Sequence, residues 1–417
     1  MDCFISLLAW RGLRLHYALR VAAFAPALQA DVPSERVYNL PVASTTSASE
    51  ELALQPADAS LTPLASLLVS EKGTLPIAVR GGAQSFAHFG DPAAELSTLL
   101  YSVGLCDLGF RTRISVTGED KFRWLNGMVT NAVSTLGQGK GNYNFVLNAQ
   151  GRIQGDAYVF HEHDGLLIET DRSQAGRLLE HLNRFIIMDD VELADLSSRT
   201  TALGLVGPGA ATLLARLGFG PTLEELESRS ASICGVAVTV VRGYGPLAPR
   251  FELWADPSKT SMLWQILTAA GGRAVGLAAQ DSLRVLEGTP LYGIDIQERN
   301  LVQETGQTRA LNFTKGCYLG QEIVERIRSR TTVNRFLRQF ELKGAVPEAG
   351  VELRSPGEER AAGSFTSVAT YMVNGLPAAL ALGYIRREVL DSGFAIEYEG
   401  GTARVLASPP AIPVRDV

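Results

Sequence analysis

The sequence predicts an α+β protein built from a duplicated α+β unit and a small antiparallel β-barrel at its C-terminus. The order strand, glycine turn, helix, later strand and helix occurs twice, over residues 113–185 and again over residues 203–270. After residue 335 the chain changes to short strand-like runs separated by Gly and Pro. With 417 residues, of which 46% are hydrophobic, the chain is long enough for two or three packed units.

The first unit begins with an expected short strand at 113–116. Thr117-Gly118-Glu119-Asp120 then has the spacing of a capping box, with Asp in place of the usual Glu, and predicts a helix through Met128. Alternating residues predict a hairpin of strands 142–148 and 153–160, followed by a strand at 166–169 and a helix at 173–185.

The second unit repeats this plan. We expect a strand at 203–206, a helix at 210–217, a strand at 251–256 and a helix at 260–270. The barrel is expected from the runs 336–342, 368–373, 379–385, 394–398 and 403–406. The predicted divisions are therefore 1–61, 62–198, 199–334 and 335–417.

Residues 1–61 differ from the rest of the chain. Their apolar stretch is interrupted by Arg11, Arg14 and Arg20, so it lacks the ~20 uninterrupted residues that cross a bilayer. The same arginines argue against a signal peptide, despite the small residues at 27–30. We expect an unstructured extension or a wrongly assigned start codon, and no membrane partner.

The net charge of −6 gives no reason to expect direct DNA binding. One basic cluster could contact RNA, although a solvated face offset by nearby glutamates is the alternative; it comprises Arg326, Arg328, Arg330, Arg335 and Arg338. The four cysteines, at 3, 106, 234 and 317, include no Cys-x-x-Cys pair, so we expect neither a metal site nor a disulfide framework. A reducing, cytoplasmic location fits this pattern.

The densest chemical signal is residues 315–322, Lys-Gly-Cys-Tyr-Leu-Gly-Gln-Glu, which we call the signature segment. A thiol reacts as its thiolate, so Cys317 needs a lowered pKa, which Lys315 and a helix beginning at Tyr318 could both supply. Gly316 and Gly320 allow tight turns and close approach. Gln321 and Glu322 add polar groups for a partner or for the loop itself. The alternative is that Cys317 is a small buried hydrophobe.

The signature segment resembles that of the YgfZ folate-binding proteins, which are related to the glycine-cleavage T-protein, an aminomethyltransferase. The resemblance extends from about residue 62 to the C-terminus and includes 116–120, 125–131, 147–152, 301–306, 312–314, 323–326, 333–335 and 382–388. It implies two related α+β domains and a C-terminal barrel around a central folate-binding hole. It also implies tetrahydrofolate or a derivative as cofactor, with Cys317 and Lys315 at the functional site.

The same resemblance suggests residues that contact folate. Glu252 and Arg284 lie in segments similar to those whose glutamate and arginine contact folate in the T-protein, while Tyr292 and Asn148 are weaker candidates. One departure concerns catalysis. The acid required by the T-protein for aminomethyl transfer is matched by Gly155, and Asp156 would point to the opposite face of its strand.

Three functions follow from these observations. The leading hypothesis is a YgfZ-type accessory protein that supports iron–sulfur cluster assembly or repair and cluster-dependent tRNA modification, with assembly or client proteins as partners. The alternatives are a folate-dependent aminomethyltransferase of the T-protein type and a folate-binding scaffold without chemistry. Gly155 disfavours the aminomethyltransferase.

Overall fold

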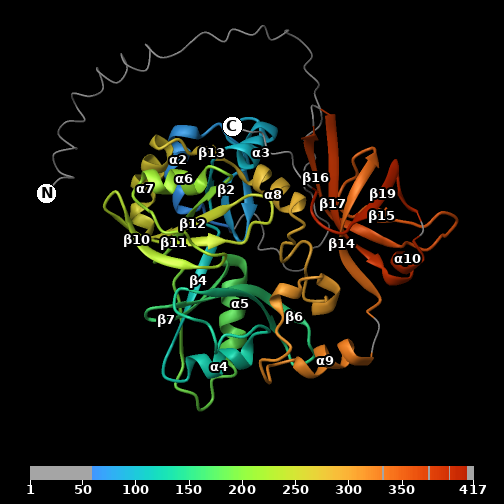
Figure 1. Ribbon diagram of the computed structural model, residues 1–417, viewed down its shortest axis with the longest axis horizontal. Helices are drawn as coiled ribbons and strands as arrows, with labels where there is room; N and C mark the ends of the chain where they lie inside the picture. Colours follow the sequence, from blue (N-terminus) through green and yellow to red (C-terminus); the bar gives the residue numbers. More distant parts are fainter. Residues whose placement is uncertain (1–58, 331–332, 374–375, 394, 411–417) are drawn as a thin grey trace, which may run out of the picture. The chain divides into compact units, whose positions relative to one another are not determined.

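The computed structural model describes residues 59–330, 333–373, 376–393 and 395–410. The expected extension at residues 1–61 therefore lies almost wholly outside the described residues. Three sheets organise the remainder, together with a hairpin of β1 (Ile77–Arg80) and β2 (Ala83–Phe86), as Figure 1 shows.

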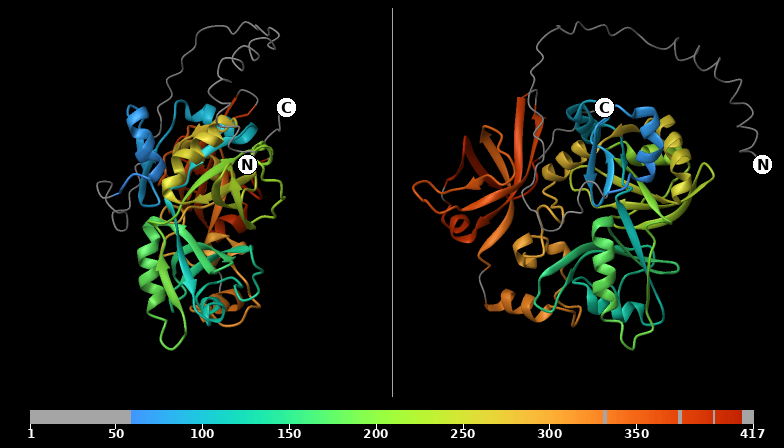
Figure 2. Two further views of the ribbon diagram at one scale, coloured as in Figure 1. Left: turned by 90° about the vertical axis from the view of Figure 1, so that its left-hand side faces the viewer. Right: turned by 180° about the vertical axis from the view of Figure 1, so that it is seen from behind.

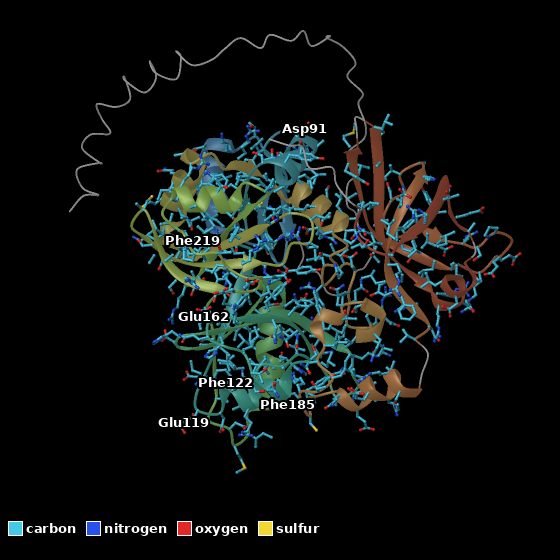
Figure 3. The ribbon with its side chains drawn as sticks, viewed as in Figure 1. Asp91, Glu119, Phe122, Glu162, Phe185 and Phe219 are labelled. Atoms are coloured by element: carbon cyan, nitrogen blue, oxygen red, sulfur yellow. The ribbon has the colours of Figure 1, made fainter. Side chains whose placement is uncertain are left out.

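The first sheet is five-stranded and antiparallel, in the order β5-β6-β7-β4-β8. Its strands are β4 (Arg111–Thr117), β5 (Gly141–Leu147), β6 (Ile153–Glu162), β7 (Gly165–Asp171) and β8 (Glu192–Asp195). Helices α4 (Lys121–Met128) and α5 (Arg172–Asn183) contribute Leu125 and Leu178 to a core with the apolar residues of this sheet. At one end of this unit the Trp124 indole donates to the carbonyl of Phe185, and Figure 3 labels Phe122 and Phe185 in this part of the molecule.

The second sheet is six-stranded, in the order β10-β11-β12-β9-β3-β13. Its strands are β3 (Gly104–Asp107), β9 (Thr201–Val206), β10 (Ser228–Ile233), β11 (Val236–Gly243), β12 (Arg250–Ala255) and β13 (Arg273–Val275). Helices α2 (Pro63–Lys72), α6 (Ala210–Arg216) and α7 (Thr260–Ala269) pack against it through a shared apolar core. Helices α3 (Pro92–Tyr101) and α8 (Leu277–Leu286) complete this part.

The predicted duplication is confirmed by strand order. The run β5-β6-β7-β4 in the first sheet corresponds to β10-β11-β12-β9 in the second. Helices α4 and α6 follow β4 and β9, and helices α5 and α7 come after β7 and β12. Strand β3 pairs with β9, so residues 104–107 of the expected first division lie in the sheet of the second.

The C-terminal part forms the predicted antiparallel barrel-like sheet, in the order β15-β16-β17-β14-β19-β18. Its elements are β14 (Arg335–Gly344), β15 (Glu352–Leu353), β16 (Gly363–Val373), β17 (Leu376–Arg386), α10 (Arg387–Ser392), β18 (Ile396–Tyr398) and β19 (Gly401–Leu406). A bridge between Arg354 and Glu397 brings the two edges together and nearly closes the sheet. Two further views are given in Figure 2.

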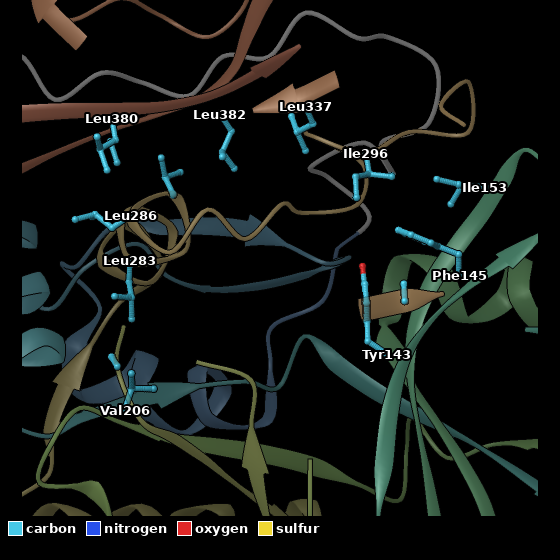
Figure 4. Close-up of a cluster of buried hydrophobic side chains, with 14 of the residues drawn as sticks. Tyr143, Phe145, Ile153, Val206, Leu283, Leu286, Ile296, Leu337, Leu380 and Leu382 are labelled. Carbon is cyan, nitrogen blue, oxygen red and sulfur yellow. The ribbon is translucent and has the colours of Figure 1, made fainter. Parts of the chain in front are cut away.

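The largest apolar core joins all three sheets. It includes Phe145 and Ile153 from the first sheet, Leu283 from α8, and Leu337 and Leu382 from the barrel, as Figure 4 shows. The segment that links the second unit to the barrel contains η2 (Val302–Thr305), η3 (Thr308–Ala310) and α9 (Gln321–Arg330), whereas η1 (Pro257–Lys259) lies between β12 and α7.

Two local expectations were wrong. The capping box at 117–120 does not form, because Thr117 belongs to β4 and pairs with Glu192, and the N-cap residue Asp120 makes no side-chain capping bond. The helix of the signature segment begins at Gln321 instead of Tyr318, because Gly320 adopts a left-handed φ of 80° that interrupts the helix.

Among the described residues, no helix is both long and apolar enough to span a bilayer.

Candidate functional site

The signature segment is fastened to the first unit by Lys315. Its ammonium nitrogen donates to the backbone carbonyls of Asn126, Val129 and Asn131, at 2.5, 2.5 and 2.7 Å. These carbonyls lie at and just beyond the C-terminal end of α4, where the helix dipole is negative and orphan carbonyls need donors. Lys315 therefore acts as a side-chain cap for a helix nearly 190 residues away in sequence.

This capping role argues against the expected catalytic role of Lys315. A lysine ammonium has three N–H donors, and here all three are directed at carbonyls. Burial lowers the pKa of Lys315 to about 7, and the three carbonyls oppose this by favouring the ammonium form. All three N–H donors of Lys315 are thus used by carbonyls at and just beyond the end of α4.

The glycines of the segment have different roles. Gly320 lies against the β5–β6 turn, where a Cβ would come within 2.5 Å of the Asn148 carbonyl oxygen. In the same turn, a Cβ added at Gly151 would lie 2.9 Å from the Cβ of Ile323 in α9. Gly316 has a φ of 92° but open space around it, so it serves only the turn.

Cys317 lies on the surface of this fastened loop. It is exposed and free, and it precedes α9 by four residues. Before Cys317 the loop is held by Lys315. After it, the Leu319 N–H donates to the Gly127 carbonyl, and Tyr318 is buried with its N–H donating to the Gln321 side chain. Cys317 is therefore not the buried hydrophobe of the alternative reading.

The other motif residue, Glu322, is exposed in the first turn of α9. There its negative charge suits the positive end of the helix dipole.

Arg284, Asn148 and Tyr292 are all engaged by the protein itself. Arg284 is buried in α8 and bonds to Asp281, Asp295 and the Ser367 hydroxyl of β16, so it ties the second unit to the barrel. The Asn148 carboxamide accepts from the backbone N–H groups of residues 150 and 152, as expected of a turn former. The Tyr292 hydroxyl accepts from Arg177 and donates to the Gln154 carbonyl.

Glu252 belongs to a buried charged network that connects β4, β7 and β12. Glu169 is ion-paired to Arg111 at 3.2 Å and to Arg113 at 2.9 Å, and Arg113 lies 3.9 Å from Glu252. Burial and the neighbouring Glu169 raise the pKa of Glu252 to about 7, while Glu252 also accepts from the Trp254 indole at 2.9 Å. At neutral pH this carboxyl can therefore either donate or accept a proton.

Asp156, rather than position 155, presents an acid to the side of the first sheet that faces the large core. A Cβ at Gly155 would lie 2.8 Å from Gln174 Oε1 and 2.9 Å from Leu178 Cδ2, in the packing of α5. Asp156 pairs with Phe145 across the sheet and accepts from the Tyr143 hydroxyl at 2.7 Å. Burial raises its pKa. As expected from the alternation of β6, residues 155 and 156 project to opposite faces of the sheet: position 155 faces α5, and Asp156 faces the tyrosines.

Sequence reasoning missed a cluster of tyrosines around Arg309 of η3. The Arg309 guanidinium lies 3.9 Å from the ring centroid of Tyr244 and 4.1 Å from that of Tyr143, and it donates to the Tyr158 hydroxyl at 3.2 Å. We call these three tyrosines with Arg309 the tyrosine cluster. Tyr143 and Tyr158 are paired residues of β5 and β6, whereas Tyr244 follows β11. No local pattern in the sequence connects these positions.

The charged network and the tyrosine cluster form one continuous set of contacts. Tyr143 contacts both Asp156 and Tyr158, and the Arg111 guanidinium lies 5.8 Å from the ring centroid of Tyr158 while pairing with Glu169. Two titratable carboxyls, Asp156 and Glu252, are thus linked through aromatic faces and arginines. This set of groups offers proton donors, proton acceptors and stacking surfaces together.

A pocket of about 560 Å³ lies beside the signature segment. Its walls are the β5–β6 turn, with Arg152, and helix α9, with Ile323 and Arg326, while Leu301 and Glu304 lie on a third side. Its volume is in the range of pockets that take small organic molecules. In the described ranges, no group of three or more His, Cys, Asp or Glu side chains is arranged to hold a metal.

Comparisons with known proteins bear on these groups. The family model described as the GCVT N-terminal domain matches residues 83–315, which ends at Lys315 and leaves out the rest of the signature segment. An aminomethyltransferase of Rubrobacter xylanophilus is 29% identical over 307 residues, covering 73% of this chain and 81% of the relative. A chloroplastic putative transferase of Arabidopsis thaliana is 25% identical over 343 residues, covering 80% and 78%.

Among solved structures, the glycine cleavage system aminomethyltransferase T of Bartonella henselae superposes with a TM-score of 0.74. The match covers 85% of this chain and 98% of that one at 20% identity, so it establishes a shared fold. The predicted arrangement of two α+β units and a barrel is that fold.

Proposed function

Because the chain belongs to the family of the GCVT N-terminal domain, we propose that it is a tetrahydrofolate-binding protein. The observation that carries the proposal is the continuous set of groups from Asp156 through the tyrosines to Glu252. Relatives of the chain are named aminomethyltransferases, a class of enzyme that uses tetrahydrofolate.

The chemistry of these residues suits a folate. One edge of a pterin carries N–H groups, and carboxylates such as those of Glu252 and Asp156 can accept hydrogen bonds from them. The flat pterin ring can stack on tyrosine faces. Arg113 Nε and Nη1 are buried without hydrogen-bond partners within the part of the chain that the structure describes, which leaves donors beside Glu252 for polar groups of a ligand. When bound, tetrahydrofolate would supply a carrier for one-carbon units.

Calorimetry with tetrahydrofolate tests this proposal. Loss of a charge-assisted contact should weaken binding about ten- to hundredfold, so we expect Glu252→Gln and Asp156→Asn each to do so. Asp164→Asn is a matched control, because its carboxylate is almost fully exposed in the β6–β7 turn. Wild-type affinity in both site variants, with folding intact, would exclude this location.

At a finer level we propose a YgfZ-type protein that supports iron–sulfur cluster assembly or repair and cluster-dependent tRNA modification in the cytoplasm. The support is the intact signature segment and the exposed Cys317 on a loop fastened at both sides. Assembly or client proteins would be its partners, and the thiol would act where they can reach it.

A deletion strain separates this role from folate binding. We expect Cys317→Ala to leave folding and folate affinity unchanged while failing to restore cluster-enzyme activity and tRNA modification. Cys234→Ala is the matched control, since Cys234 is also free and exposed but lies in the β10–β11 turn. Full complementation by the Cys317 variant would remove the thiol from the function.

A second function, aminomethyl transfer, is favoured by the orientation of Asp156. An acid facing the tyrosine cluster could hold or move a proton during transfer to tetrahydrofolate. Tetrahydrofolate-dependent ammonia release from an aminomethylated carrier protein measures this activity directly. Release by the wild type and its loss in Asp156→Asn would support an enzyme, whereas no release by the wild type would leave the accessory role.

A further inference from the structure

Arg309 is a largely enclosed cation held by aromatic faces instead of by an acid. Its guanidinium lies over the rings of Tyr244 and Tyr143, and the Tyr158 ring is 5.7 Å away. Within residues 59–330, 333–373, 376–393 and 395–410, no carboxylate lies within ion-pair distance of it. By contrast, the nearby Arg111 and Arg113 both pair with Glu169.

A cation withdrawn from water without a counter-charge is costly. Contacts with aromatic faces offset only part of this cost. Two nitrogens of Arg309 have partners: Nη1 donates to the Tyr158 hydroxyl and Nε to the Gln307 side chain. Its Nη2 donates to no described residue and is therefore available to a ligand. The side chain is partly exposed, so a ligand group can reach these donors.

The backbone around Arg309 is fixed before any ligand arrives. The Asn131 side chain donates to the Arg309 carbonyl at 2.9 Å, and the Thr130 hydroxyl donates to the Ala310 carbonyl at 2.7 Å. Asn131 and Thr130 follow α4, whose end Lys315 caps. The guanidinium is therefore presented by a preorganised segment, which reduces the ordering cost of binding.

We propose that Arg309 is the binding residue for a carboxylate group of the ligand. Its planar fork suits a carboxylate, and the Tyr244 hydroxyl, which makes no hydrogen bond to a described residue, can donate to the same group. Tyr143 contacts both Arg309 and Asp156, so a ligand carboxylate bound to Arg309 would be separated from Asp156 by this one side chain. The inference rests on the proposed ligand site and adds the chemical group recognised there.

Two ligands could supply the carboxylate: the glutamate end of tetrahydrofolate, or a separate small amino acid that acts as one-carbon donor. Calorimetry on the full chain distinguishes them with two matched pairs of probes. Tetrahydrofolate is compared with tetrahydropteroate, which lacks the glutamate, and glycine is compared with glycinamide, which lacks the carboxylate. Arg273→Gln is the control variant, because Arg273 of β13 is exposed and makes no ion pair with a described residue.

We expect Arg309→Gln to weaken one carboxylate-bearing probe at least about tenfold and to leave its carboxylate-free counterpart unchanged. A selective loss for tetrahydrofolate identifies its glutamate as the source, and a selective loss for glycine identifies a small acid. Equal affinities of folded Arg309→Gln and wild type for both carboxylate probes would overturn the proposal, as would equal losses within each pair.

A second, more conservative variant keeps the test decisive if Arg309→Gln misfolds. Arg309→Lys keeps the charge but loses the planar fork, so about a three- to tenfold selective loss is expected, and an unchanged affinity counts against the proposal. If the wild type binds neither tetrahydrofolate nor tetrahydropteroate, the proposed function has failed, and the glycine pair alone then decides the role of Arg309.

Discussion

Replacing Lys315 by Met tests whether the signature lysine is a helix cap or a partner of the thiol. Methionine keeps most of the apolar stem and removes the ammonium that bonds three carbonyls at the end of α4. The three N···O distances are 2.5–2.7 Å, short for such bonds. The carbonyls of Asn126, Val129 and Asn131 would lose this donor.

The magnitude follows from these contacts. Each charge-assisted hydrogen bond contributes about 1.5–3 kcal/mol, and the cost of withdrawing the ammonium from water offsets part of their sum. We expect a net loss of about 3 kcal/mol in the free energy of unfolding, which lowers Tm by about 6–12 °C for a unit of this size.

Thermal unfolding and hydrogen exchange measure the effect together. We expect faster exchange in residues 126–131 and in the signature segment, with little change in the barrel. The matched control is Lys121→Met, because Lys121 is on the same helix but donates to only one carbonyl, that of Gly118. The cap is refuted if Lys315→Met unfolds within about 1 °C of the wild type. A role beside the thiol would instead change the pH dependence of Cys317 alkylation in this variant.

The other predictions concern glycines and Glu252. Gly320→Ala should lower the free energy of unfolding in urea by about 3 kcal/mol or more, because the new Cβ would lie 2.5 Å from a backbone oxygen. Gly316→Ala should cost only the ~1–2 kcal/mol of its left-handed φ, because the space around it is open. Equal losses in the two variants would contradict this packing. Because the folded pKa of Glu252 is raised from 4.5 to about 7, the stability from this group is full below about pH 4.5 and declines as the pH rises through about 7. Glu252→Gln should abolish that decline and be about 1–2 kcal/mol more stable at pH 8, and urea midpoints at pH 5 and 8 that shift equally in both proteins would refute it. Gly155→Asp should destabilise the first unit without creating transferase activity, because the new side chain meets Leu178 of α5; a stable and newly active variant would contradict the assigned strand face.

Local sequence signals identified most of the elements. The hairpin of β5 and β6 follows from alternating apolar residues around Gly151. The duplicated plan was visible because β4 and β9 are each followed by a glycine turn and an apolar helix. The barrel strands were likewise marked by Gly and Pro, apart from the two-residue β15, which is too short to show alternation. These features depend on neighbours within a few residues.

Some local signals were overruled by distant partners. Thr117 pairs with Glu192 in β4 instead of forming the capping box. Helix α9 begins at Gln321 instead of Tyr318 because Gly320 fits against the Asn148 carbonyl. In each case a contact between residues far apart in sequence decided a boundary that propensity alone placed differently.

By itself, the sequence determined the fold class, the duplicated units and the barrel, and it singled out the signature segment, whose functional role stays a prediction. Only the tertiary structure decided what the chemical groups do. It directed Lys315 to the end of α4, placed Asp156 and not residue 155 toward the tyrosines, and enclosed Arg309 among rings from β5, β6 and the loop after β11. The physical reason is that spacing along a chain fixes the face on which a side chain projects, whereas its charge state and its partners depend on groups that folding brings from elsewhere.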